Sequence, residues 1–145
     1  MRIFSCFAIV ALSVLVAPTA SAQVSRVALD SKHCPHGECV DVYEYDFVDV
    51  QPAFPGDERG LINYINSERK YPYDAYKKRI QGRVLCSFVI DVDGKVCNVT
   101  VLRGAYPSLD KEAVRIIKDM PEWKPGKMNG VAVPVRYILP IPFRL

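Results

Sequence analysis

The segment RVLCSFVIDVDGKVCNVTVL, residues 83–102, alternates apolar and polar residues on both sides of Asp93-Gly94. Alternation with a period of two predicts half-buried strands, and Asp-Gly is the pair that two-residue hairpin turns prefer. We therefore expect an antiparallel hairpin whose turn is formed by these two residues. In that register Ile90 faces Cys97, Phe88 faces Val99, and Cys86 faces Val101.

One face of this hairpin is almost entirely apolar and is predicted to face the core. It comprises Val84, Cys86, Phe88, Ile90, Cys97, Val99 and Val101. Cys86 and Cys97 share this face but lie about four steps, roughly 13 Å, apart along the ladder. That separation exceeds what a disulfide spans, so we expect these two cysteines not to bond to each other.

Two helices and a last strand flank the hairpin. DERGLINYINSERKY places Leu61, Ile62 and Ile65 at helical spacing, and PSLDKEAVRIIKDMP predicts a second helix that Ser108 caps and Pro121 ends. The apolar side of the second helix comprises Leu109, Ala113, Ile116, Ile117 and Met120. The chain then ends in VAVPVRYILPIPFRL, whose odd-numbered positions are apolar, which predicts a third strand.

The order helix, hairpin, helix, strand limits the topology. The second helix reverses the chain, so the last strand runs antiparallel to the first when it lies beside it. This gives an α+β fold, a two-layer sandwich in which a three-stranded antiparallel sheet of order 2-1-3 carries two helices on one face.

The first residues predict export from the cytoplasm. Arg2 precedes the apolar run IFSCFAIVALSVLV, and TASAQ supplies small residues before a cut ahead of Gln23. Residues 1–22 are therefore interpreted as a signal peptide, and Cys6 is removed with it. The alternative is an uncleaved inner-membrane anchor that leaves the rest of the chain facing the periplasm.

Charge divides the remaining chain into an acidic arm, residues 23–53, and a basic domain, residues 54–145. Residues 30–58 hold eight acidic side chains against one lysine, whereas residues 59–145 hold 16 Lys and Arg against 8 Asp and Glu. Because the chain is exported, nucleic acid is not expected as a partner, and the charge of the domain points to acidic protein segments, anionic envelope surfaces or the chain's own arm. Because both histidines lie in the arm, a histidine-based catalytic site in the domain is not expected, and we predict neither an enzyme nor a cofactor.

The stretch KHCPHGEC, residues 32–39, leaves three interpretations open. A local Cys34–Cys39 disulfide is favoured, because the compartment is oxidising and the spacing differs from that of thiol oxidoreductases. A bond from this loop to Cys86 or Cys97 is the second alternative. A metal site is the third, disfavoured because four donors within so short a stretch crowd a tetrahedral ion.

From about Phe54 to the C-terminus the chain contains, in this order, the pieces FPGDERGLINYI, RKYPYDA, IQGRVLCSFVIDVDGKVCNVTVLRG, LDKEAVRIIKDMPEWKPGKMNG and VPVRYILPIPFRL. With these pieces the chain resembles the C-terminal domain of TonB energy transducers, in particular their FPG variants. The resemblance implies a periplasmic domain that binds the TonB box of outer-membrane TonB-dependent receptors in energy-coupled transport across the membrane. Binding of this kind adds a strand to an exposed sheet edge.

The prolines of the last strand indicate which of its positions face the open edge. Proline cannot donate a ladder hydrogen bond, so Pro134, Pro140 and Pro142 place the even-numbered residues outward. The docking window is therefore predicted at Val135, Arg136, Tyr137, Ile138 and Leu139. The same prolines also blunt an aggregation-prone edge. Tyr76 lies in the YPxxA turn, where the family presents a polar residue to the receptor segment, and is included in the predicted partner site.

A cleaved signal peptide changes what the resemblance implies. A transducer needs an inner-membrane helix to reach its motor proteins, so a chain that loses residues 1–22 is a stand-alone periplasmic adaptor, competitor or sensor. Whether the chain forms a homodimer stays open. A further hypothesis is that the strand-like acidic segment Val40 to Val50 pairs with the domain's free edge or covers its outer face, carrying Leu85, Val89, Leu102 and Ile138, instead of remaining a solvated arm.

Overall fold

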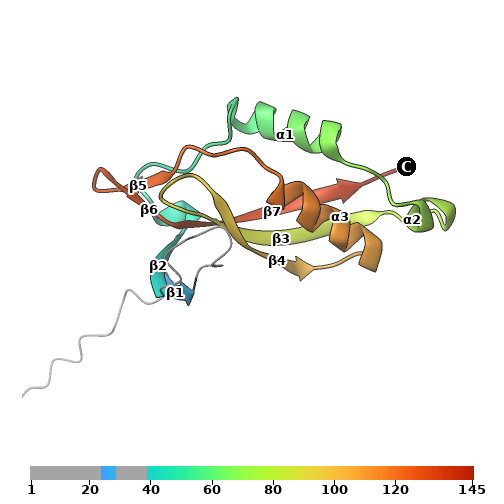
Figure 1. The fold of residues 1–145 in the computed structure, drawn as a ribbon, viewed down its shortest axis with the longest axis horizontal. Coiled ribbons are helices and arrows are strands. Elements are labelled where there is room, and N and C mark those ends of the chain that lie inside the picture. Colours follow the sequence, from blue (N-terminus) through green and yellow to red (C-terminus); the bar gives the residue numbers. More distant parts are fainter. Residues whose placement is uncertain (1–23, 29–38) are drawn as a thin grey trace, which may run out of the picture.

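The computed structural model describes residues 24–28 and 39–145 and shows one sheet with helices on one side (Figure 1). The strands are β1 (Val24–Ala28), β2 (Cys39–Glu44), β3 (Gly82–Ile90), β4 (Val96–Arg103), β5 (Gly126–Met128), β6 (Val131–Val133) and β7 (Val135–Phe143). The helices are the 3-10 turn η1 (Tyr45–Phe47), α1 (Asp57–Glu68), α2 (Tyr73–Lys77) and α3 (Pro107–Lys118).

The main sheet has the order β1-β2-β7-β3-β4, and β5 and β6 form a separate ribbon. Within the main sheet, β4, β3 and β7 are antiparallel neighbours, which confirms the α+β class and the predicted order of these three strands. The prediction of a three-stranded, all-antiparallel sheet is wrong. The arm adds β2, which pairs with β7 in parallel, and β1 pairs antiparallel with β2.

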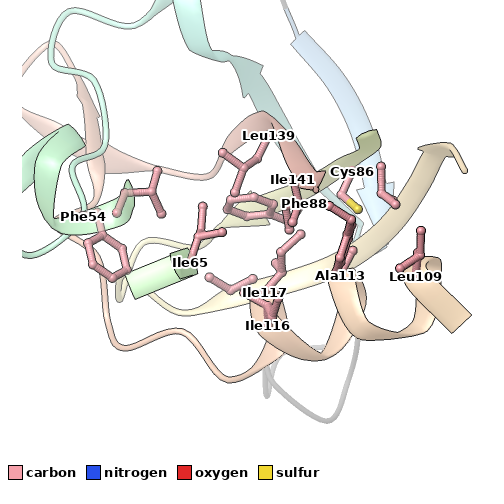
Figure 2. Packing of buried hydrophobic residues seen from close by; sticks show 14 of the residues in the cluster. Phe54, Ile65, Cys86, Phe88, Leu109, Ala113, Ile116, Ile117, Leu139 and Ile141 are labelled. Atoms are coloured by element: carbon pink, nitrogen blue, oxygen red, sulfur yellow. The ribbon is translucent and has the colours of Figure 1, made fainter. Parts of the chain in front are cut away.

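The core lies between the sheet and the two longer helices. Leu61 and Ile65 of α1 and the apolar side of α3 pack against the side chains of β3 and β7 that point the same way (Figure 2). Every second residue of β7 is buried or half-buried, as its alternation predicted. Ile62, predicted on the apolar side of α1, is instead half exposed, so the buried stripe of this helix is narrower than expected.

The hairpin forms, but its register differs from the prediction. Ile90 pairs with Val96, and Val89 pairs with Cys97, because the loop contains an extra residue. The register shifts again within β4, where Asn98 adopts a positive φ of 51°, so that Cys86 faces Val101 as predicted. These two irregularities leave Cys86 opposite Val101 as predicted and place Val96 in the core where Cys97 was expected, and a further shift pairs Leu85 with Arg103.

Cys86 and Cys97 consequently lie on opposite faces of the sheet, and they are not bonded to each other, as predicted. Cys86 is a fully buried free thiol, which excludes a bond from the arm to this residue. The Cys97 Sγ donates to the Val89 carbonyl at 3.5 Å. The predicted bond between Cys34 and Cys39 and the signal peptide lie outside the described residues, apart from the backbone of Cys39.

Helix α3 begins one residue before the predicted cap. Pro107 occupies its first turn and Tyr106 is the N-cap, so the expected capping role of Ser108 is wrong. Instead the Asp110 carboxylate accepts a hydrogen bond from the Ala105 backbone N–H at 2.9 Å and secures the helix start.

The last part of the arm is tied to the domain through the segment before β6. The backbone groups of Val50 exchange hydrogen bonds with those of Lys127 at 2.8 and 3.0 Å, and Ala53 does the same with Lys124. Val48 is buried. Residues 48–53 therefore hold the arm on the domain and direct β2 towards β7.

We predict that Gly94→Ala destabilises the protein at least about 2 kcal/mol more than Gly130→Ala. Both glycines have positive φ values, 81° and 77°, so both substitutions introduce the same backbone strain. At Gly94 a Cβ would also lie 1.9 Å from the Trp123 carbonyl oxygen, whereas nothing lies within 4 Å at Gly130. Urea unfolding measures the difference, and equal losses would contradict the tight packing of this turn on Trp123.

We also predict that stability falls between about pH 9 and pH 11 because of Cys86. Burial, together with the smaller effect of the Asp110 carboxylate, raises the pKa of this thiol to about 11. The unfolded chain, with an ordinary thiol pKa of about 9, loses its proton first as the pH rises, so folding is opposed progressively up to the folded pKa. Cys86→Ala should show a smaller decline in unfolding free energy over this range, and parallel curves would contradict the assignment.

Candidate functional site: the edge of strand β7

Strand β7 is paired along its whole length on one side. Each of its residues from Val135 to Phe143 lies opposite a residue of β3, from Ile90 to Gly82. In an antiparallel ladder, alternate residues turn both backbone groups to the same side. Because the prolines at 140 and 142 cannot donate, the odd residues bond to β3 and the even residues face the other edge.

That other edge is partly occupied by the chain itself. Tyr43 of β2 donates its backbone N–H to the Pro134 carbonyl at 2.9 Å, which confirms that an even position faces outward. The parallel register then places Tyr43 opposite Val135 and Glu44 opposite Arg136, and it ends there. At the opposite end of β7, the Arg69 guanidinium donates to the Pro142 carbonyl at 2.7 Å.

Among the described residues, Ile138 is therefore the outward N–H donor of β7 that no strand covers. Its side chain is 49% exposed. Pro140 offers only a carbonyl. The window predicted from the prolines is thus divided into an occupied half at Arg136 and an open half at Ile138.

Side chains strengthen the attachment of the arm at the occupied half. Arg136 donates to the Glu44 carboxylate at 3.0 Å, and both side chains are roughly 70% buried. One residue further along, the Tyr45 ring meets the Tyr137 ring edge-on, with centroids 5.1 Å apart. Burial raises the pKa of the Tyr137 hydroxyl, and the neighbouring Tyr45 and Glu58 raise it further.

Tyr137 belongs to an aromatic cluster that continues into the core. Its ring lies 5.2 Å from the Trp123 ring and 5.5 Å from the Phe88 ring, measured between centroids. Trp123 is only 4% exposed and belongs to the core. Tyr45 of the arm is thus the outermost member of a stack that starts in the core of the domain.

Two recesses flank Tyr45. The larger, of about 430 Å³, lies beside the start of α1 and includes Trp123 and Tyr137 in its wall. The smaller, of about 270 Å³, lies at the β7 edge and is lined by Glu44, Tyr45, Asp46, Arg136, Tyr137 and Ile138. Because Tyr45 and Tyr137 line both, removal of the Tyr45 ring would join the two recesses over the Tyr137 ring.

The predicted site residues separate into three groups. Val135 and Leu139 are buried and point to the core, so their side chains offer no surface for contact with a partner. Arg136, Tyr137 and Ile138 lie at the edge, and all three line the smaller recess. Tyr76 lies in α2 and is 60% exposed. Its ring lies beside that of Tyr71, which in turn lies beside Phe143 at the far end of β7 (Figure 1). That end is about 20 Å along the strand from Arg136.

Sequence reasoning did not identify Glu44 and Tyr45 as part of the site. The alternation of acidic, aromatic and β-branched residues in VDVYEYDF predicted a strand, and the pairing of β2 with β7 confirms the hypothesis that this segment pairs with the domain's free edge. No pattern in the sequence indicated the direction or register of that pairing. In the described part of the chain, no cluster of three or more metal-ligating side chains occurs. Nor does any helix there combine the length and hydrophobicity that crossing a bilayer requires.

Comparison with known proteins relates the domain to one family. The model of the Gram-negative bacterial TonB protein C-terminal family matches residues 67–145, more than half of the chain. Among solved structures, two solution structures of the Helicobacter pylori TonB C-terminal domain match at 26% and 27% identity, each with a TM-score of 0.46. They cover 59% of this chain and 77% and 89% of their own lengths. No curated protein matches the chain significantly.

We predict that amide hydrogen exchange distinguishes the two halves of the β7 edge. The Ile138 amide, outside the β2 pairing, should exchange at least about tenfold faster than that of Leu139, which faces Cys86 in the ladder. The Arg136 amide, opposite β2, should be protected as well. Exchange measured by NMR in the folded chain tests this, and equal protection of Ile138 and Leu139 would contradict the assigned edge.

Proposed function

Because the chain belongs to the TonB C-terminal domain family, we propose that its domain binds an extended segment, the TonB box, of outer-membrane TonB-dependent receptors in the periplasm. The segment adds as a strand to the β7 edge, centred on Arg136 and Ile138. This is a binding role in energy-coupled transport and involves no catalysis by the chain.

The observation that carries this proposal is the pairing of β2 with β7. Tyr43 and Glu44 already form a parallel strand on this edge, so its geometry accepts an added strand. The outward backbone groups between Pro134 and Pro140 supply the hydrogen bonds that give affinity in strand addition. The side chains of Arg136 and Ile138 alternate along the same edge and supply contacts that can distinguish partners.

The basic character of the domain supports an acidic partner segment. Residues 59–145 have twice as many basic as acidic side chains. Arg136, which lies within the edge, already holds a carboxylate in the folded chain. A receptor segment with an acidic residue at the matching position would form the same ion pair with Arg136.

We predict that Arg136→Pro reduces binding of outer-membrane receptors at least about tenfold, because it removes a backbone donor and leaves the partner's carbonyl unpaired. Arg136→Lys is the matched control, since it keeps both the N–H and the positive charge. Receptors captured from solubilised outer membranes of the source cell on immobilised protein provide the measurement. Full binding by a folded Arg136→Pro variant, or none by the unaltered chain, would refute the proposal.

A further inference from the structure

We propose that β2 and η1 are a built-in ligand that occupies the docking edge, and that a partner segment binds by displacing them. This inference rests on the proposed function for the identity of the partner, but the occupancy itself is a property of this chain. It also specifies the chemistry of the segment that replaces the arm: an acidic residue opposite Arg136, followed by an aromatic residue against Tyr137.

The edge left open beside β2 is too short for a second strand. Beyond Arg136, the uncovered outward N–H donor belongs to Ile138, because the next outward positions are Pro140 and Pro142. The Pro142 carbonyl already accepts from Arg69. A partner segment therefore gains a continuous ladder only if it also takes the groups of Pro134 and Arg136 that β2 now uses.

The arm has the features of a bound peptide. It is extended through Glu44, makes a backbone hydrogen bond at Tyr43, forms an ion pair through Glu44, and packs an aromatic ring through Tyr45. Strand-addition ligands combine main-chain hydrogen bonds with side chains that fill recesses at alternate or successive positions. Tyr45 stands between the two recesses beside Tyr137, where a ligand's anchor side chain would lie.

The backbone attachment of the arm to β7 is short. Its pairing with β7 covers two register positions, whereas β3 is paired with β7 along the full strand. The arm also stays tethered through Val50 and Ala53 to the segment 124–127 when β2 is displaced. It would therefore remain close to the edge and compete at a high effective concentration.

The test measures whether loosening the arm opens the edge. The probe is a fluorescein-labelled synthetic peptide, SVDVYEYDF, which copies residues 39–47 with serine in place of Cys39. Its binding is followed by anisotropy with the full chain, purified after export. Tyr43→Pro removes the N–H that bonds to Pro134, and Tyr43→Val removes the same ring but keeps the N–H.

We expect the probe to bind Tyr43→Pro at least about tenfold more tightly than Tyr43→Val, because an occupied edge lowers apparent affinity in proportion to its occupancy. A probe with lysine at the Glu44 position should bind Tyr43→Pro at least about threefold more weakly than the original probe. Equal binding of the original probe to both folded variants, or binding to neither, would overturn the inference.

If Tyr43→Pro does not fold, Glu44→Gln replaces it and is compared with Glu122→Gln, which makes the same charge change at an exposed position. Glu44→Gln should bind the probe about threefold more tightly than Glu122→Gln, and equal binding would overturn the inference. Receptor capture with the same variants separates the two proposals. Tighter probe binding without any receptor binding leaves the built-in ligand standing and removes the proposed function.

Discussion

The antiparallel ladder between β3 and β7 is the constraint on which the rest of this structure depends. It pairs every residue of β7 and fixes which of them point to the core and which to the edge. The prolines at 134, 140 and 142 are tolerated only at outward positions, because a proline turned towards β3 would leave a β3 carbonyl without its donor. A shift by one residue would also expose Val135, Leu139 and Ile141 together. Register, core and edge are therefore set by the same residues.

An edge fixed in this way is a hazard as well as the proposed binding surface, since unpaired strand edges join other chains without selectivity. The structure limits this hazard in two ways. Prolines remove donors towards the end of β7, and the arm covers its beginning through Tyr43 and Glu44. The uncovered part is thereby reduced to the region around Ile138. Selectivity follows from this arrangement, because a partner must match the arm before it gains the longer edge.

Much of the fold could be predicted because its signals are local. Proline parity identified the orientation of β7, alternation identified β3 and β4, and helical spacing identified α1 and α3. The hairpin register could not be predicted, because it depends on a longer loop ending at Gly94, on the left-handed backbone at Asn98 that compensates for it, and on a further shift between Leu85 and Cys86. Asp-Gly favours a turn but does not fix the loop length.

The candidate site was half predicted for a related reason. Arg136 and Ile138 followed from the prolines of their own strand. Glu44 and Tyr45 lie about 90 residues earlier, and their strand carries no periodicity that specifies a partner or a direction. A parallel pairing across that separation depends on the ties at Val50 and Ala53, which bring the arm past β7. These two bridges are formed by backbone groups, so the pattern of side chains in the sequence could not predict them.

The polar and aromatic contacts that hold the end of the arm on β7 are each weak. A backbone hydrogen bond contributes about 1 kcal/mol, a half-buried ion pair such as Glu44–Arg136 up to about 1 kcal/mol, and an edge-on aromatic pair about 1 kcal/mol. A partner strand that repeats these contacts gains the same terms, and it adds the groups of Ile138 and Pro140 that the arm leaves uncovered. The arm therefore lowers the affinity of every partner by the same factor. A partner strand that extends along β7 offsets this lower affinity through its additional contacts with Ile138 and Pro140. Discrimination then depends on the length and register of the incoming strand as well as on its side chains.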